Sequence, residues 1–341
     1  MQFQPRKTTL SALSLISLIS ILCVLVGLFS VRAGSGYFDG LLSHSGTTIQ
    51  SPTPTREYIY AGKRLLAIAD SGADFANQKH IAIWRPSTGT WWIYGGESPS
   101  QAIQWGMEGD IPLIGDFDGD LIDDLSVYRP MTGEWWTRHS ADESVRHCRF
   151  GLSGDVPFIR DFNSDGHADI SVFRPSNGTW YVRDSKTESI VAIQFGQTGD
   201  IPFPADYTGD RLVDLGIWRP MERTYFIRDS ASGKILTYSI ASSAPEVVSG
   251  DYDGDLISDM ALRSGDTWIV GPDGPSQRQI QWFSNADIPV PADFDGDGKT
   301  DIAVWRSSTG TWMVSNSRDS SFLQFQWGRQ GDIPLFGTFS P

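Results

Sequence analysis

Residues 109–130 read GDIPLIGDFDGDLIDDLSVYRP. An apolar run at 111–114 leads into an acidic loop at 116–124, and a second apolar run follows at 125–128. Short β-rich runs bounded by Gly, Pro and Asp are typical of strands. The stretch therefore predicts two strands joined by an acidic loop.

The acidic loop recurs along the chain at a nearly fixed period. A degraded copy precedes the five good ones between Asp70 and Pro86, and a lone apolar segment at 333–339 follows them. Self-similarity at this period indicates a repeat architecture, here one array from about residue 57 to the end. The first acids of the five loops, separated by 45, 45, 45 and 42 residues, are Asp116, Asp161, Asp206, Asp251 and Asp293.

Each unit contains four strand-like runs, and no helix is expected after residue 31. Four short strands in units of about 40–50 residues are typical of a β-propeller. Runs such as 81–84 and 91–93 are apolar on both faces, whereas a sandwich sheet alternates. The predicted fold class is therefore all-β, a propeller. In the second unit the four runs are 111–116, 124–129, 134–139 and 145–151.

The number of blades depends on how the two ends of the array are used. Six full units are followed by the segment 333–339 and preceded by a predicted hairpin at 57–69, two β-rich runs about a Gly. These ends either build a partial seventh blade together, which we favour from the sequence, or close a ring of six.

The charge lies mostly in the loops. The formal net charge is −14, but 18 of the 41 acidic residues belong to the five loops, and the remaining 23 are outnumbered by 27 Lys and Arg. No basic stripe is present, which argues against nucleic acid as a partner. The two cysteines, Cys23 and Cys148, do not fix the redox compartment.

The sequence before the array, residues 1–55, divides into two parts. Residues 1–33 form a signal peptide or an N-terminal membrane anchor, because the apolar run at 10–31 would reach about 33 Å as a helix and Val31-Arg32-Ala33 suits a signal peptidase. Residues 34–55 are a flexible Ser/Thr/Pro/Gly linker, and 56–341 form the propeller. Both alternatives predict an exported protein, secreted or at the cell surface, which contacts a membrane only through an uncleaved N-terminus.

The loops have the pattern of calcium sites. Oxygen-bearing side chains occupy positions 1, 3, 5 and 9, while position 7 varies and is expected to offer only its backbone carbonyl. Hard oxygens on a tight loop suit Ca²⁺ better than Mg²⁺; the alternative is a set of Asx turns. We expect about five structural sites, at Asp116, Asp118, Asp120, Ile122 and Asp124; Asp161, Asn163, Asp165, His167 and Asp169; Asp206, Thr208, Asp210, Leu212 and Asp214; Asp251, Asp253, Asp255, Ile257 and Asp259; and Asp293, Asp295, Asp297, Lys299 and Asp301.

These motifs resemble the FG-GAP/VCBS repeat of integrin α-subunit propellers and of bacterial exported proteins. The aromatic-Gly pairs at 105–106, 150–151, 195–196 and 327–328 stand for the FG pair, and Gly-Asp-Ile-Pro stands for Gly-Ala-Pro. The resemblance covers about residues 57–341. It implies a propeller with the first strand of each blade innermost, Ca²⁺ on one face, and ligands at the opposite face or between blades.

Two recurring residue types have competing interpretations. Trp at one place on the third strand, and Trp, Tyr or Phe on the second, predict packing between blades rather than a sugar platform. An Arg that ends the second strand is expected to pair with the Asp of Gly-Asp-Ile-Pro rather than form a ligand-binding ring. These arginines are Arg85, Arg129, Arg174, Arg219 and Arg306.

No catalytic constellation is evident. The histidines at 44, 80, 139, 147 and 167 neither recur nor show metal-ligand spacing, so we do not expect an enzyme. The favoured function is an adhesion or interaction module that binds an extracellular protein or a glycan. The alternative is a carbohydrate-binding lectin on the same fold, and a propeller polysaccharide lyase or hydrolase ranks below both.

Overall fold

The computed structural model describes residues 56–61, 64–70, 79–94, 100–242, 246–272, 274–282, 284 and 286–338. The predicted leader at 1–33, the linker at 34–55 and the degraded first loop at 71–78 lie outside this part. The described residues contain strands, turns and no helix, and hence no helix able to cross a bilayer.

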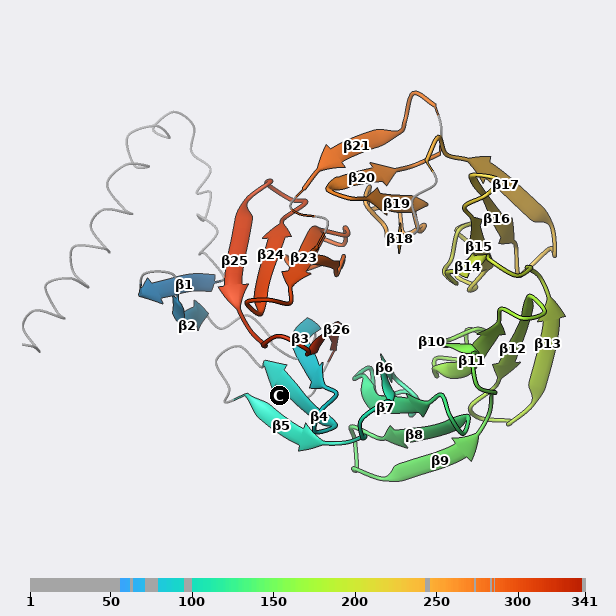
Figure 1. The fold of residues 1–341 in the computed structure, drawn as a ribbon, viewed down its shortest axis with the longest axis horizontal. Helices are drawn as coiled ribbons and strands as arrows, with labels where there is room; N and C mark the ends of the chain where they lie inside the picture. Colours follow the sequence, from blue (N-terminus) through green and yellow to red (C-terminus); the bar gives the residue numbers. More distant parts are fainter. Residues whose placement is uncertain are drawn as a thin grey trace, which may run out of the picture. The chain divides into compact units, whose positions relative to one another are not determined.

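Six antiparallel sheets of four strands form a propeller (Figure 1). The first strand of each sheet lies nearest the centre of the ring and the last lies at the outside. Blade 1 contains β26 (Ile333–Thr338), β3 (Lys79–Arg85), β4 (Thr90–Tyr94) and β5 (Gln101–Gln104). Blade 2 contains β6 (Ile111–Gly115), β7 (Asp124–Arg129), β8 (Glu134–Arg138) and β9 (Val145–Arg149).

The other four blades follow in chain order. Blade 3 contains β10 (Val156–Arg160), β11 (Asp169–Arg174), β12 (Thr179–Arg183) and β13 (Ile190–Gln194). Blade 4 contains β14 (Ile201–Pro202), β15 (Leu215–Arg219), β16 (Thr224–Arg228) and β17 (Ile235–Ser239). Blade 5 contains β18 (Glu246–Val247), β19 (Ala261–Ser264), β20 (Thr267–Val270) and β21 (Arg278–Gln281). Blade 6 contains β22 (Ile288–Pro289), β23 (Ile302–Arg306), β24 (Thr311–Ser315) and β25 (Phe322–Gln326).

The ring closes with six blades, so the partial seventh blade is a wrong expectation. The C-terminal strand β26 pairs along its whole length with β3, from Ile333 opposite Trp84 to Thr338 opposite Lys79. It thereby supplies the inner strand that the degraded first unit lacks. The predicted hairpin is present, as β1 (Arg56–Ala61) and β2 (Arg64–Asp70) pair antiparallel, but they form a separate two-stranded sheet.

Burial falls from the second strand of a blade to the fourth. In β7 and β11 every residue but the last is buried, on both faces of the sheet. In β9 and β13 nearly every residue is exposed. The sequence argument from runs that are apolar on both faces is therefore confirmed, because neighbouring blades cover both sides of the middle strands.

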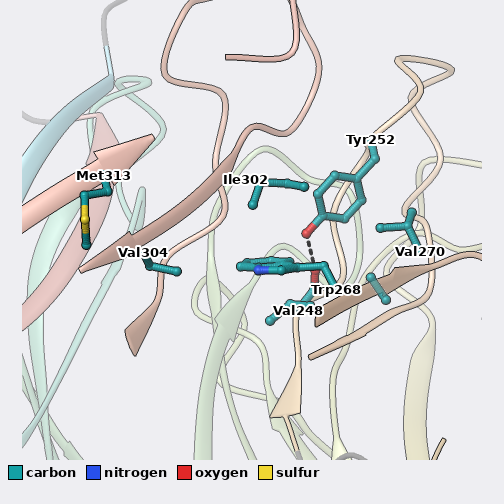
Figure 2. Close-up of a cluster of buried hydrophobic side chains, with 8 residues drawn as sticks. Val248, Tyr252, Trp268, Val270, Ile302, Val304 and Met313 are labelled. Atoms are coloured by element: carbon teal, nitrogen blue, oxygen red, sulfur yellow. Dashed lines mark hydrogen bonds between the residues drawn. The ribbon is translucent and has the colours of Figure 1, made fainter. Parts of the chain in front are cut away.

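The recurring aromatic residues form the packing between blades. Between blades 5 and 6, Trp268 and Val270 of β20 pack with Val304 of β23 and Met313 of β24 (Figure 2). The packing interpretation is confirmed, because the exposed fraction is at most 1% at Trp84, Trp91, Tyr128, Trp135, Phe173, Trp180, Trp218, Tyr225, Trp268, Trp305 and Trp312.

The aromatic-Gly pairs have a physical role. The carbonyl oxygen before the glycine accepts a hydrogen bond from the indole N–H of the third-strand Trp, as in Trp180 Nε1 to Phe195 O at 2.9 Å and Trp135 Nε1 to Phe150 O at 2.7 Å. A Cβ on Gly196 would lie 2.9 Å from the ring of Phe173. Glycine is needed there because the backbone passes directly over a buried aromatic ring with φ of 141°.

Each recurring arginine pairs with a buried aspartate at the start of its blade. Arg174 donates from Nε and Nη2 to the two carboxylate oxygens of Asp155, both at 2.8 Å. The predicted pairing is confirmed at five blades, with Arg85–Asp332, Arg129–Asp110, Arg174–Asp155, Arg219–Asp200 and Arg306–Asp287. In blade 5, Ser264 and Pro245 stand at the two places and the pair is absent from the sequence.

Candidate metal loops and an inter-blade cavity

The first aspartate of each loop accepts hydrogen bonds from the loop backbone, and its carboxylate also carries a negative charge. Asp116 Oδ1 accepts the N–H of Gly119 at 2.6 Å, and its Oδ2 accepts the N–H of Leu121 at 2.8 Å. Asp206, Asp251 and Asp293 make the equivalent pair of bonds. The loop is therefore wound around this side chain.

Three loops gather carboxylates in the way a cation requires. One oxygen from each side chain at positions 1, 3 and 5 lies within 4.8 Å of the others in the sets Asp116, Asp118, Asp120; Asp251, Asp253, Asp255; and Asp293, Asp295, Asp297. The loops at 161 and 206 have Asn163 and Thr208 at position 3 and so bring one fewer carboxylate together. All donors are hard oxygens, which fits Ca²⁺.

The aspartate at position 9 joins two turns of its blade by hydrogen bonds. Asp124 Oδ2 accepts the N–H of Phe117 at 2.9 Å and Oδ1 accepts that of Ser140 at 2.6 Å. Asp169, Asp214 and Asp301 make the same two bonds. Each oxygen keeps a lone pair, so the position remains able to bind a cation.

Burial of these carboxylates has an electrostatic consequence. Asp124, Asp169, Asp214 and Asp301 are at most 1% exposed. Desolvation raises the pKa of all four, and of Asp259, above the usual value, and raises that of Asp169 to about 6. A bound divalent cation would favour the charged form and oppose this shift.

The variable position 7 faces the preceding blade. A Cβ on Gly119 would lie 2.9 Å from the imidazole of His167, and one on Gly254 would lie 2.9 Å from the side chain of Lys299. His167 Nδ1 also lies 2.9 Å from the carbonyl oxygen of Phe117. The side chain at position 7 thus packs between loops. Only the backbone carbonyl of this residue would then be available to bind a cation, as the sequence predicts.

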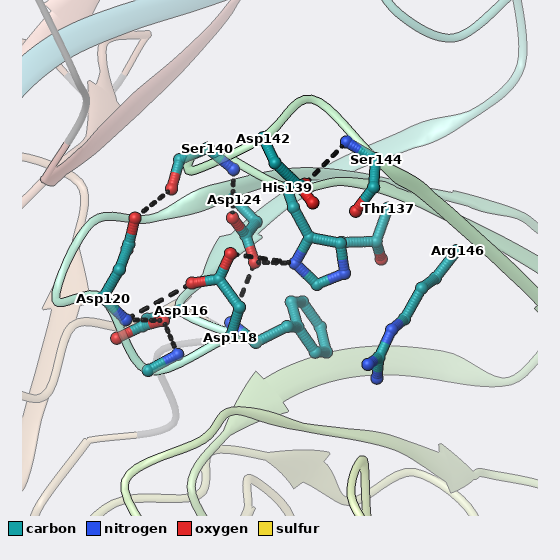
Figure 3. A network of polar contacts seen from close by, with 12 residues as sticks. Asp116, Asp118, Asp120, Asp124, Thr137, His139, Ser140, Asp142, Ser144 and Arg146 are labelled. Atoms are coloured by element: carbon teal, nitrogen blue, oxygen red, sulfur yellow. Dashed lines mark hydrogen bonds and ion pairs between the residues drawn. The ribbon is translucent and has the colours of Figure 1, made fainter.

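His139 is a residue that sequence reasoning missed. It follows β8, and its Nδ1 lies 3.3 Å from Asp118 Oδ2 and 3.1 Å from Asp124 Oδ2, with its side chain 3% exposed (Figure 3). The loop period points only to residues within each loop. The signal that could have found His139 is its place in the turn after the third strand, where Asp184, Asp229 and Asn316 stand in other blades.

A cavity of about 390 Å³ opens between blades 2 and 3. Its lining includes Arg146 of β9 and Arg183, Lys186 and Glu188 of blade 3. Arg183 pairs with Glu188 at 3.2 Å, and Arg146 Nη1 lies 3.5 Å from the carbonyl oxygen of Ser185. With three cations against one carboxylate, the lining is positive in a protein of formal charge −14.

Cys148 also lines this cavity, beside His147. Burial raises the pKa of the Cys148 thiol, whereas a catalytic cysteine needs a lowered pKa to supply thiolate. His147 instead stacks on Trp136, with ring centroids 4.0 Å apart. This pair therefore lacks the electrostatics of a nucleophile and its base.

Comparison with known proteins supports the fold. No protein-family model matches the chain, and no curated protein matches it. A TolB structure from Acinetobacter baumannii superposes with a TM-score of 0.56 at 14% identity, over 77% of this chain and 67% of that one. An Agrocybe aegerita lectin that recognises non-reducing terminal N-acetylglucosamine gives 0.51 at 15% identity, over 74% and 76%.

A third similar structure belongs to an enzyme. A catalytically inactive virginiamycin B lyase from Staphylococcus aureus, crystallised with quinupristin, has a TM-score of 0.50 at 9% identity over 74% of this chain and 85% of that one. Identities this low show a common propeller fold and nothing finer. The FG-GAP/VCBS assignment therefore remains a prediction from the motifs of this sequence.

Proposed function

We propose that the chain is an exported Ca²⁺-binding propeller of the FG-GAP/VCBS type that acts as an adhesion or interaction module. The observation that carries the calcium part is the convergence of three carboxylates within 4.8 Å in the loops at 116, 251 and 293. The residues that would hold the ion are those at positions 1, 3, 5 and 9, with the carbonyl at position 7. The ion would neutralise the loop and stabilise the folded ring by linkage.

Export is proposed from the apolar segment at 10–31 and its flanking Arg6 and Lys7. Either a cleaved signal or an anchor would place the propeller outside the cytoplasm. There, free calcium is high enough to fill sites of modest affinity.

A carbohydrate-binding role is a second candidate, and the cavity between blades 2 and 3 favours it. Its positive lining suits a ligand with a carboxylate or sulfate group, and an acidic sugar fits that chemistry. An acidic segment of a surface protein offers the same charge, so the two functions make different predictions only about the nature of the partner.

One screen separates these functions. The protein is applied with and without Ca²⁺ to an array of neutral and acidic glycans and to a panel of extracellular proteins. Binding to acidic glycans that R146Q weakens supports the lectin; binding to proteins alone supports the interaction module. R149Q is the matched control, because Arg149 lies on the same strand and donates to Thr132 O. Turnover of a bound polysaccharide into unsaturated or hydrolysed products would overturn both in favour of an enzyme.

A further inference from the structure

The surroundings of His139 differ from those of every other loop described. Its Nδ1 lies 3.1 Å from Asp124 Oδ2 and 3.3 Å from Asp118 Oδ2, and these three side chains can each offer one ligand atom to the same ion. Neither ring nitrogen has a hydrogen-bond partner within the described residues, although the side chain is 3% exposed. A buried imidazole without such partners calls for an explanation.

The two separations from His139 Nδ1 are close to those of a small coordination sphere. Tetrahedral zinc with bonds of about 2.0–2.2 Å to nitrogen and oxygen places its ligand atoms about 3.3–3.6 Å apart. The separations at His139 are 3.1 and 3.3 Å. Calcium binds oxygen ligands at about 2.3–2.6 Å, so an imidazole nitrogen is not one of its usual ligands.

The alternative is a protonated His139 that neutralises the two carboxylates itself. An imidazolium carries two N–H donors, and leaving both unbonded in a buried place is costly. Nδ1 lies near both oxygens but makes no hydrogen bond to either. A lone pair on Nδ1 directed at a shared cation accounts for the arrangement better than a proton does.

We propose that His139 Nδ1, Asp118 Oδ2 and Asp124 Oδ2 bind a first-row transition ion such as Zn²⁺, with a fourth position left for water. Nitrogen donors suit these metals. Other blades have Asp184, Asp229 or Asn316 in place of the histidine, so among the turns that the structure describes, that of blade 2 alone offers an imidazole. The site shares Asp118 and Asp124 with the proposed calcium ligands of its loop, so these two carboxylates would bridge both ions. This inference does not depend on the identity of the partner.

The test uses Co²⁺ as a spectroscopic probe and Zn²⁺ as competitor. The full-length protein is stripped of metal with a chelator and then supplied with about 1 mM Ca²⁺, the largest Kd typical of extracellular calcium modules. We expect one Co²⁺ per chain with the visible bands of a low-coordinate site, displaced by Zn²⁺. H139N, which introduces the residue found in blade 6, should weaken binding by more than about 100-fold, since loss of an outer partner alone costs 10–100-fold. H147N, at an exposed histidine of the same blade, should bind as the wild type.

Equal Zn²⁺ binding by the wild type and H139N, or an equal loss in H147N, would overturn the proposal. If H139N does not fold, the wild type alone decides the matter by nitrogen NMR of labelled histidine. Zn²⁺ should then shift the Nδ1 resonance of His139 and leave that of His147 in place; an imidazolium signal at His139 that ignores Zn²⁺ refutes the site. The calcium dependence of the melting temperature is measured separately, so failure here leaves the proposed function untouched.

Discussion

The backbone N–H of Ala168 in blade 3 donates to the carbonyl oxygen of Asp116 in blade 2 at 2.6 Å. The same bond joins Ser258 to Asp206 at 2.8 Å and Thr300 to Asp251 at 2.5 Å. Position 8 of one loop is therefore bonded to position 1 of a neighbouring loop. Because position 1 is a proposed metal ligand, a cation in one loop also fixes the blade beside it.

Calcium removal should consequently destabilise the whole ring. At 100 times its Kd, each ion adds about 2.7 kcal/mol, and about 2–4 °C of Tm accompanies each kcal/mol in a large domain. We expect a chelator to lower the Tm by at least about 5 °C in a single transition. Melting with chelator, with Ca²⁺ and with Mg²⁺ as the control measures this, and equal Tm values with Ca²⁺ and chelator would contradict the calcium proposal. The loops at 161 and 206 should lose their ions first.

The metal-free protein should show an unusual dependence of stability on pH. Desolvation raises the pKa of Asp124, Asp169, Asp214, Asp259 and Asp301. The folded state then holds more protons than the unfolded state between about pH 4 and pH 6, so these groups make stability fall as pH rises through that window. Bound Ca²⁺ should remove the fall by favouring the charged carboxylates.

Urea unfolding at pH 4.5 and pH 7, each with chelator and with Ca²⁺, measures this difference. Carboxylates outside the loops, such as Asp229 and Asp319 with lowered pKa, contribute equally in both conditions and cancel. A pH slope that is the same with and without Ca²⁺ would mean that the ion does not reach position 9.

The fold was largely predictable because its information is local and repeated. The four runs expected in the second unit match β6 to β9 within two residues at each end, and the Arg–Asp pairing follows from residue types that recur together. The loop ligands were equally visible as a pattern, since a period of 45 aligns them.

The two features that sequence reasoning missed depend on contacts between distant segments. Whether 333–338 pairs with β3 or with the hairpin at 56–70 is decided by the geometry of ring closure, which no local pattern encodes. His139 meets Asp118 and Asp124 because two turns of one blade converge. His139 has no histidine at the equivalent position of another unit, so comparison of the repeats does not point to it.

The Arg174–Asp155 pair should be asymmetric under mutation. The Asp155 side chain is 1% exposed while that of Arg174 is 20% exposed. R174M therefore leaves a buried carboxylate uncompensated and should cost about 3 kcal/mol, whereas D155N leaves an arginine that can turn to water and should cost less. Urea denaturation compares the two, with R149M as the surface control. A larger loss in D155N than in R174M would contradict this asymmetry.

Leu121 is a site where a single glycine should stabilise the protein. It occupies position 6 of its loop with φ of 69° and is 76% exposed, while Gly166 and Gly298 fill the same position in other loops. A left-handed conformation costs a non-glycine residue about 1–2 kcal/mol, and glycine gives back roughly half of this through the entropy of the unfolded chain. The free energy of unfolding of L121G, measured with urea in the presence of Ca²⁺, should therefore be about 0.5–1 kcal/mol larger than that of L121A. The alanine variant loses the same side chain but keeps the strain, so it separates backbone relief from lost contacts. An L121G protein less stable than L121A would show that the loop tolerates φ of 69° without strain, as a backbone held by Asp116 and a bound ion would allow.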